Sequence, residues 1–122
     1  MTRIFFFLGA LSALIGVSAG AFGAHVLKGR ISADLMTVFE KGARYQMYHA
    51  FALFAAAWAQ AKWPSAIVVS GGWLFAAGTL LFCGSLYLMS LTGVRWLGGI
   101  TPLGGVSFVA GWACLAWAAL KS

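Results

Sequence analysis

The sequence predicts an all-α integral membrane protein, a bundle of four transmembrane helices with an amphipathic segment before the second span. Of the 122 residues, 62% are hydrophobic and 8% are charged, whereas about 25% of residues in a soluble domain are charged. A second indication is that four apolar stretches, each close to the length of about 20 residues that a span needs, make up most of the chain. This composition excludes a soluble enzyme, a disordered segment and a free nucleic-acid-binding protein.

The first apolar stretch runs from Ile4 to about Ala24, and we expect the span to cover residues 4–27. A basic residue before the stretch and small residues near its end imitate a secretory signal peptide with its cleavage site. However, the apolar run is too long for the core of a typical signal peptide. We therefore expect it to remain as the first transmembrane helix.

The most polar part of the chain follows, from His25 to Arg44. Ser32 in this part is a typical helix N-cap, and the apolar residues after it recur at helical spacing. We expect a short amphipathic helix that lies on or enters the membrane and continues into a second span over residues 44–61. The whole helix would be roughly 43 Å long, against a hydrocarbon core of about 30 Å. Its first third is therefore expected to lie outside, to tilt strongly or to bend near Gly42.

Two further spans, over residues 66–91 and 101–120, complete a single domain that comprises residues 1–122. Thr101 is predicted to be the N-cap of the last span, with Pro102 at the first helical position. Four spans place both termini on one side of the membrane. The loops after the first and third spans carry five Lys and Arg residues, against three on the opposite side. This difference favours termini that face away from the cytoplasm.

The net charge of +6 has a membrane interpretation. The basic residues occur one or two at a time at the ends of apolar stretches, where they anchor helices in the headgroup region. Nucleic acid is therefore not an expected partner, whereas the lipid bilayer is. Cys83 and Cys114 both fall inside apolar stretches at different depths, so no disulfide is expected between them.

Small residues form stripes along three of the four spans. The residues predicted to pack are Gly16 and Gly20 in the first span, Gly71 and Gly78 in the third, and Gly104 and Gly111 in the fourth. Lipid tails are as apolar as leucine, so helices associate through close contact, which small residues allow. The third and fourth spans share the pattern Gly-Gly-x-x-Phe-x-Ala-Gly, which fits either an internal duplication or a convergence of two small-residue stripes.

A group of polar side chains is expected near one surface of the membrane. Its members are His25, Glu40, Arg44, Tyr45, Tyr48 and His49. The four-residue spacing puts Glu40, Arg44 and Tyr48 on one helix face, and Glu40 is expected to pair with Arg44. Because the first two spans are antiparallel, His25 should lie near the turn that contains His49. Four interpretations stay open: a polar cap for helix ends, a site for a lipid headgroup, quinone or small anion, a proton or ion pathway, and a metal or haem site.

No nucleophile and base occur together in a pattern typical of catalysis. We therefore predict no catalytic residue, no metal site, no cofactor and no enzymatic activity. Two histidines without a third ligand at suitable spacing are weak support for a metal. The hydroxyl side chains on the small-residue faces usually bond between helices; they are Thr79, Ser85, Ser90 and Ser107.

Several segments occur in an order that resembles a known family. They are residues 20–25 (GAFGAH), 44–50 (RYQMYHA), 84–88 (GSLYL), 91–93 (LTG), 99–105 (GITPLGG) and 110–112 (AGW). Over nearly its whole length the chain resembles the domain-of-unknown-function 423 family, small bacterial inner-membrane proteins that are related to transmembrane protein 256 of animals. The resemblance implies four spans in the inner membrane, and it supplies no catalytic residue and no substrate.

Three functions remain open at this point. The first is a structural or accessory membrane protein that binds a larger membrane protein or a second copy of itself. The second is a small channel or exporter formed by a homo-oligomer, and the third is lipid or quinone binding at the rim that contains His25, Arg44 and His49. Four short helices with glycine-rich stripes pack too closely to enclose a large cavity. A monomeric transporter of bulky solutes is therefore not expected.

Overall fold

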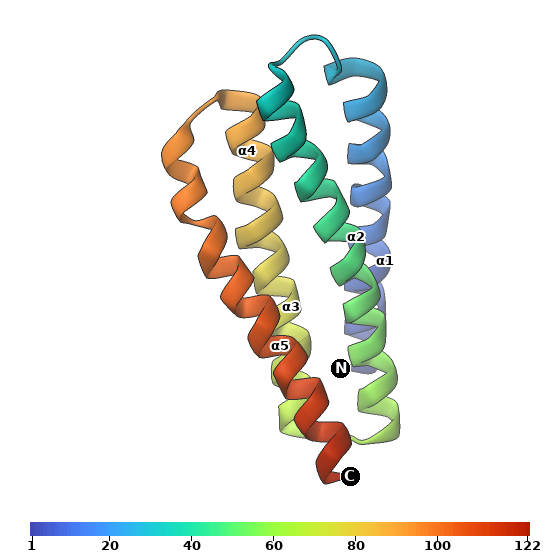
Figure 1. The fold of residues 1–122 in the computed structure, drawn as a ribbon. Coiled ribbons are helices and arrows are strands. Elements are labelled where there is room, and N and C mark those ends of the chain that lie inside the picture. Colours follow the sequence, from blue (N-terminus) through green and yellow to red (C-terminus); the bar gives the residue numbers. More distant parts are fainter.

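The computed structural model describes residues 1–122, and Figure 1 shows a bundle of long helices joined by short turns. The structure contains no strand, so the all-α prediction is confirmed. Two of the long helices include a π-helical turn, labelled η1 and η2. The elements in chain order are α1 (Thr2–Phe22), η1 (Gly23–Leu27), α2 (Ala33–Lys62), α3 (Ala66–Gly78), η2 (Thr79–Cys83), α4 (Gly84–Thr92), the short 3₁₀ helix η3 (Arg95–Gly99) and α5 (Thr101–Lys121).

Three helical runs are long and apolar enough to cross a membrane. They are Thr2–Leu27, Ala66–Thr92 and Arg95–Lys121. The fourth predicted span lies in α2, which is long enough but is less apolar than these three: besides the charged residues of its first turns, it carries Gln46, His49 and Gln60 further along. Membrane-capable helices are thus found for three of the four predicted spans.

The turns and helix starts use residues whose roles can be predicted from the local sequence. Ser32 caps α2, since its hydroxyl accepts a hydrogen bond from the Leu35 amide at 3.1 Å. Gly29 and Gly93 stand in the left-handed region that favours glycine, with φ of +85° and +74°. The predicted cap at Thr101 is wrong: α5 already includes Thr101, because its hydroxyl is hydrogen-bonded to the Ser85 hydroxyl instead.

The segment before the second predicted span does not form a separate surface helix. Residues Ala33–Lys62 make one continuous helix of 30 residues with no break at Gly42. Phe39 and Gly42 are buried, and a Cβ at Gly42 would lie 3.0 Å from the Tyr87 ring of α4. Of the three alternatives expected for the first third of this helix, the bend near Gly42 is absent, because α1 and α4 continue alongside this part of α2. Its apolar face therefore packs inside the bundle, and its charged residues point outward.

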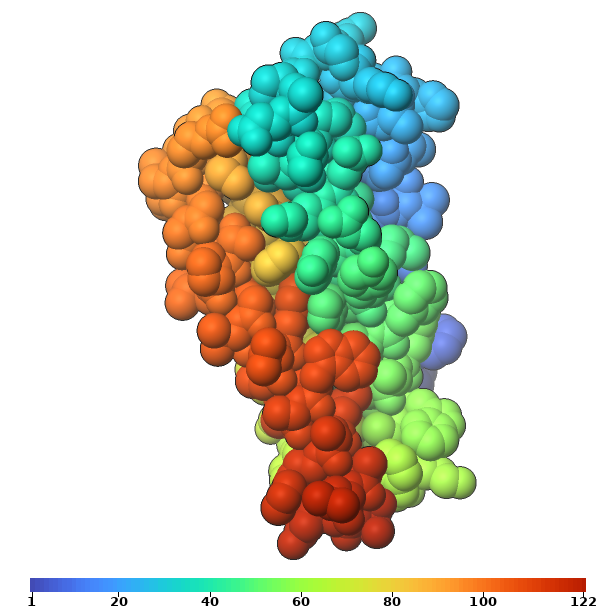
Figure 2. Space-filling model, in the orientation of Figure 1, coloured from blue at the N-terminus to red at the C-terminus, as the bar shows by residue number.

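Two antiparallel helix pairs build the bundle, α1 with α2 and α3 with α5. Along the face drawn in Figure 2, α2 and α5 meet in the lower half, and atoms of α4 are visible between them higher up. Both chain ends lie in the lower half of Figure 1. The core that joins the pairs includes the side chains of Phe5, Leu53, Phe75 and Phe108.

Glycines bring α3 and α5 into backbone contact at two levels. A Cβ at Gly71 would lie 3.2 Å from the Gly111 carbonyl oxygen, and a Cβ at Gly78 would lie 3.1 Å from the Gly104 carbonyl oxygen. The shared sequence pattern of the two helices explains this symmetry, because antiparallel copies place the first glycine of one opposite the last glycine of the other. Each helix is thus the packing partner of the other within one chain.

The phenylalanine of each pattern fills the space that the opposite glycine leaves. A Cβ at Gly111 would lie 2.7 Å from the Phe75 ring, and a Cβ at Gly78 would lie 2.5 Å from the Phe108 ring. Both phenylalanines are buried, at 0% and 4% exposure. We call these two reciprocal contacts, Phe75 on Gly111 and Phe108 on Gly78, the glycine–phenylalanine interlock.

The small-residue stripe of α1 packs along only part of its length. A Cβ at Gly9 would lie 3.0 Å from the Ala50 carbonyl oxygen, and a Cβ at Gly16 would lie 2.8 Å from the Met47 sulfur. Nothing lies within 4 Å of a Cβ at Gly20. The expectation that Gly20 packs is therefore wrong within this chain, since the α1 surface at this residue is open.

A methyl group at Gly104 tests how closely α5 approaches η2, the π-helical turn that follows α3 in the chain. Its Cβ would overlap the backbone nitrogen and Cα of Phe82, which cannot move aside as a flexible side chain would. We expect Gly104→Ala to lower the free energy of unfolding by about 2 kcal/mol, the usual range for overpacking. Thermal unfolding in detergent micelles, followed by circular dichroism, measures this loss.

Gly105 is the matched control, because it is the next residue of the same helix and its Cβ would meet Phe82 only at 3.9 Å. Gly105→Ala should be neutral or stabilising, since alanine favours a helix by about 1 kcal/mol over glycine. Equal melting temperatures for the two variants would show that α5 does not approach η2 this closely.

Candidate functional site

Of the six polar residues expected to cluster near one membrane surface, the structure brings Tyr45, Tyr48 and His49 together, whereas His25 lies apart from them. His25 lies in η1, opposite the start of α2, where a Cβ at the neighbouring Gly23 would touch Phe39 and Met36. Gly9, much lower on α1, is the residue that faces Ala50. His25 and His49 are thus separated by roughly 20 Å along the bundle, at 1.5 Å per helical residue. The short turn before Ala33 determines which residues of α2 lie beside which residues of α1 and η1, because it makes α2 start almost level with the end of η1.

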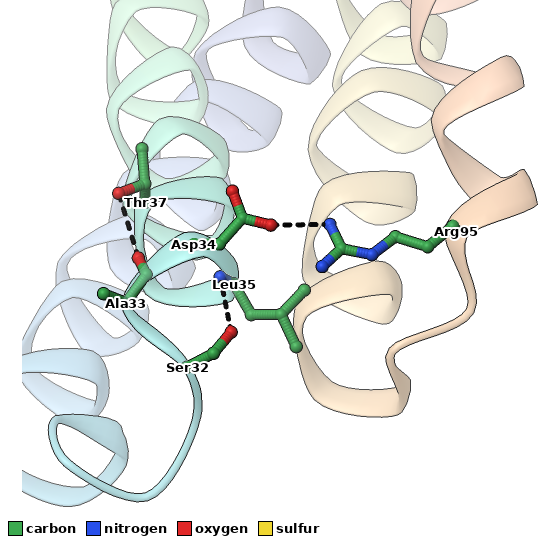
Figure 3. A network of polar contacts seen from close by, with 6 residues as sticks. All are labelled: Ser32, Ala33, Asp34, Leu35, Thr37 and Arg95. Carbon is green, nitrogen blue, oxygen red and sulfur yellow. Dashed lines mark hydrogen bonds and ion pairs between the residues drawn. The ribbon is translucent and has the colours of Figure 1, made fainter.

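The face predicted for Glu40, Arg44 and Tyr48 exists but points away from the bundle. All three side chains are exposed, and Glu40 forms no ion pair with Arg44. The ion pair of this structure joins Asp34 of α2 to Arg95 of η3 at 2.8 Å, as Figure 3 shows. Both partners are largely exposed, at 70% and 60%, and such a pair stabilises a protein by about 0–1 kcal/mol. It fixes the turn before α5 against the start of α2.

His49 is the one histidine inside the bundle, and both of its ring nitrogens are occupied. Its Nδ1 is 2.9 Å from the Tyr45 carbonyl oxygen, and its Nε2 accepts a hydrogen bond from the Trp112 indole at 3.2 Å. This arrangement requires the neutral imidazole with its proton on Nδ1. The ring also stacks on Phe108, with centroids 3.5 Å apart and planes 8° apart. His49 therefore joins α2 to α5.

Three further buried hydrogen bonds connect different helices. The Tyr87 hydroxyl donates to Gln46 Oε1 at 2.6 Å, which joins α4 to α2. The Ser85 and Thr101 hydroxyls are bonded at 2.6 Å, which joins α4 to α5. The Ser107 hydroxyl donates to the Leu74 carbonyl oxygen at 2.6 Å, which joins α5 to α3. We call these three bonds and the His49–Trp112 bond the interhelical ties.

The prediction for the hydroxyl side chains is correct for two of the four residues. Ser85 and Ser107 bond across helices, whereas Thr79 and Ser90 bond to carbonyl oxygens of their own helix. We did not predict from the sequence that Gln46 is buried. Its spacing of one turn from His49 was the available signal, since residues three apart share a helix face.

Tyr45 lies between the outward face and the core. It is half-buried, with its ring 4.8 Å from the Phe82 ring and 5.4 Å from the Tyr48 ring. Cys83 is buried and Cys114 is half-buried, and both thiols are free. No three His, Cys, Asp or Glu side chains lie close enough together to hold a metal ion. Of the five buried polar residues, Gln46, His49 and Ser85 bond another helix and Ser90 bonds its own, whereas the Ser12 hydroxyl has no partner.

Replacing Trp112 tests the His49 tie. Trp112→Phe keeps an aromatic ring but removes the indole N–H and leaves the buried His49 Nε2 without its donor. We expect a loss of about 1 kcal/mol in the free energy of unfolding, as for other interhelical hydrogen bonds in membranes. Trp117→Phe is the control, because Trp117 is about as exposed as Trp112, at 50% against 45%, and its indole N–H has no partner. Equal losses in chemical unfolding would show that the tie contributes nothing.

Comparison with known proteins agrees with this architecture. The sequence pattern of the family described as "Protein of unknown function (DUF423)" matches residues 19–105. The UPF0382 membrane protein YwdK of Bacillus subtilis is 46% identical over 120 residues, which cover 98% of each chain. The UPF0382 membrane protein SERP0230 of Staphylococcus epidermidis is 46% identical over 119 residues, covering 98% of this chain and 97% of the relative. No solved structure matches the chain. The family pattern and these relatives together show that this chain is an integral membrane protein of the DUF423 family.

Proposed function

We propose that this protein is a non-enzymatic structural or accessory component of the bacterial inner membrane. The observation that carries the proposal is the use of the buried polar groups. Ionisable side chains inside a membrane often mark a substrate or ion pathway, whereas here His49, like Gln46, Ser85 and Ser107, bonds another helix. Most polar side chains of the interior thus hold the helices together.

Side chains fill the axis of the bundle. This packing favours the structural role and argues against a pore within a single chain. Phe5, Leu53, Phe75 and Phe108 occupy the centre and are at most 4% exposed. A water path along this axis would need several aromatic rings to leave at once. Conduction would therefore require an assembly of several chains, for which no feature of this bundle argues.

We further propose that α2 crosses the membrane as the fourth span. No charged residue lies between Arg44 and Lys62, and this stretch is roughly 25 Å long at 1.5 Å per residue. It packs against α1 and α3 over this length, and both partners are long and apolar enough to cross. The residues of α2 before Arg44 would then stand in the headgroup region, where Arg44 and Lys41 can reach water.

The charges at the two ends of the bundle favour one orientation. The end that holds the turns around Gly29 and Gly93 carries Lys28, Arg30, Lys41, Arg44 and Arg95, and the other end carries Arg3, Lys62 and Lys121. Basic residues are enriched on the cytoplasmic side of membrane proteins. We propose that the end with five basic residues faces the cytoplasm.

Labelling of single cysteines tests the fourth span and the orientation together. In a chain in which Cys83 and Cys114 are replaced by alanine, cysteine would be placed at Arg30 or at Ser65. We expect a membrane-impermeant maleimide to label Ser65→Cys in intact spheroplasts and Arg30→Cys only after lysis. Labelling of both positions from the same side would refute the fourth span, and the reverse pattern would refute the orientation.

Mass spectrometry of the tagged protein, extracted from its own membranes in mild detergent, tests the accessory role. We expect a second membrane protein in stoichiometric amount, because an accessory component works in contact with a partner. As a negative control, an unrelated small membrane protein with the same tag is extracted in the same way, and proteins found in both samples are discarded as adventitious. A lone monomer in both detergent and lipid nanodiscs would contradict the proposal.

A further inference from the structure

We propose that a groove between α1 and the α3–η2–α4 run binds a neutral, carbonyl-bearing isoprenoid lipid of the quinone class. The groove is separate from the polar side chains expected at the membrane rim, and the proposal goes beyond the structural role. It rests on the shape of the groove, on two hydrogen-bond donors without acceptors and on the absence of charge along its walls.

The groove consists of two hollows that share Ile15 of α1. The deeper hollow has a volume of about 180 Å³ and is lined by side chains of α1, α2, α3 and η2. The second hollow, of about 410 Å³, continues from Ile15 toward Phe22 and Leu91 over the Phe39 ring. A cavity of roughly 150 Å³ holds benzene in another protein. The deeper hollow is therefore large enough for one substituted ring, and the second can hold the start of a tail.

Ser12 supplies the first unmatched donor. It lines the deeper hollow, its side chain is 7% exposed, and its Oγ is the one buried side-chain polar atom without a hydrogen-bond partner. Other hydroxyl residues in these helices, such as Thr79 and Ser90, bond to a carbonyl oxygen of their own helix. Buried polar groups are nearly always bonded, and a serine hydroxyl turns readily among three staggered positions. A change of the Ser12 χ1 rotamer would let its hydroxyl, which is covered in the observed conformation, donate to an acceptor placed in the hollow.

Gln46 of α2 supplies the second donor. Its side chain is 4% exposed and lines the same hollow. Tyr87 donates to its Oε1 at 2.6 Å, and this bond leaves the Nε2 amide hydrogens without an acceptor. A carbonyl oxygen has two lone pairs, so one such oxygen in the hollow can accept from both residues that line it.

The backbone beside the hollow is also irregular. Thr79 and Leu80, which line it, begin the π-helical turn η2. Single π-helical turns are rare and occur frequently at functional sites. The bulge moves the Thr79 and Leu80 side chains, which line the same hollow as Ser12 and Gln46, out of regular α-helical register.

The walls indicate that the ligand is neutral. No charged residue lines either hollow, so the phosphate of a phospholipid headgroup would find no cation there. A quinone ring combines carbonyl acceptors with an uncharged apolar tail. Its ring would occupy the deeper hollow between Ser12 and Gln46, and its tail would follow the second hollow past Phe22 and Leu91.

A thermal-shift titration of the full-length protein in micelles tests the proposal. The probes are a decyl-substituted para-benzoquinone and decylbenzene, which has the same tail and no carbonyl. A ligand that binds only the folded state raises the melting temperature in a saturable manner. We expect this rise with the quinone and not with decylbenzene.

Two variants and one control assign the effect to the groove. Ser12→Ala should weaken quinone binding by about tenfold, the cost of one hydrogen bond, and should leave the unliganded protein as stable as before because the hydroxyl has no partner there. Ile15→Trp fills the groove and should abolish the shift. Ser90→Ala removes a buried hydroxyl of a residue that lines neither hollow and should leave the half-saturating concentration unchanged.

Several results would overturn the proposal. Equal shifts with the quinone and decylbenzene would show that only the tail is recognised. Unchanged quinone binding in both Ser12→Ala and Ile15→Trp would place the ligand elsewhere. A shift produced by phosphatidylglycerol and not by the quinone, with the same dependence on Ser12, would make the groove a phospholipid site instead.

Discussion

The close approach of α3 and α5 at four glycines is the contact on which the rest of the bundle depends. In lipid, helices gain nothing from burying apolar side chains, because the surrounding tails are equally apolar. Attraction must come from atoms in contact, and dispersion falls steeply with distance. Gly71, Gly78, Gly104 and Gly111 allow the two backbones to touch, and the Phe75 and Phe108 rings fill the remaining space. A larger side chain at any of these glycines would separate the helices and remove both contacts.

The interhelical ties restrict how the packed helices can slide and rotate against one another. Glycine contacts alone tolerate a helix that slides or rotates, whereas a hydrogen bond requires two particular atoms to meet. The His49–Trp112 and Gln46–Tyr87 bonds fix α2 against α5 and α4. The α1 helix has no tie of this kind and is held by glycine contacts with α2 and by Phe5, whose ring occupies the space at Gly72. This difference explains why the groove lies beside α1.

The sequence predicted the helices well because length, apolarity and capping are local properties. The Ser32 cap, the glycines of the turns and the paired Gly-Gly-x-x-Phe-x-Ala-Gly patterns can all be read without knowing the fold. The alignment of α1 and α2 along the bundle axis, by contrast, is not a property of either helix alone. It depends on the short turn before Ala33, and it separates His25 from His49. An amphipathic pattern likewise predicts which face is apolar, but not whether lipid or protein covers it, and here Tyr87 covers Gly42.

A double-mutant cycle on the glycine–phenylalanine interlock tests the central claim most directly. Gly111→Ala, Phe75→Leu and the double variant would be compared with the parent chain by unfolding in the same micelle. If the Phe75 ring fills the space at Gly111, the methyl group should cost less when the ring is absent, with a coupling of about 1 kcal/mol or more. Additive losses would show that the two residues do not share this space, and the account of how α3 and α5 associate would be wrong.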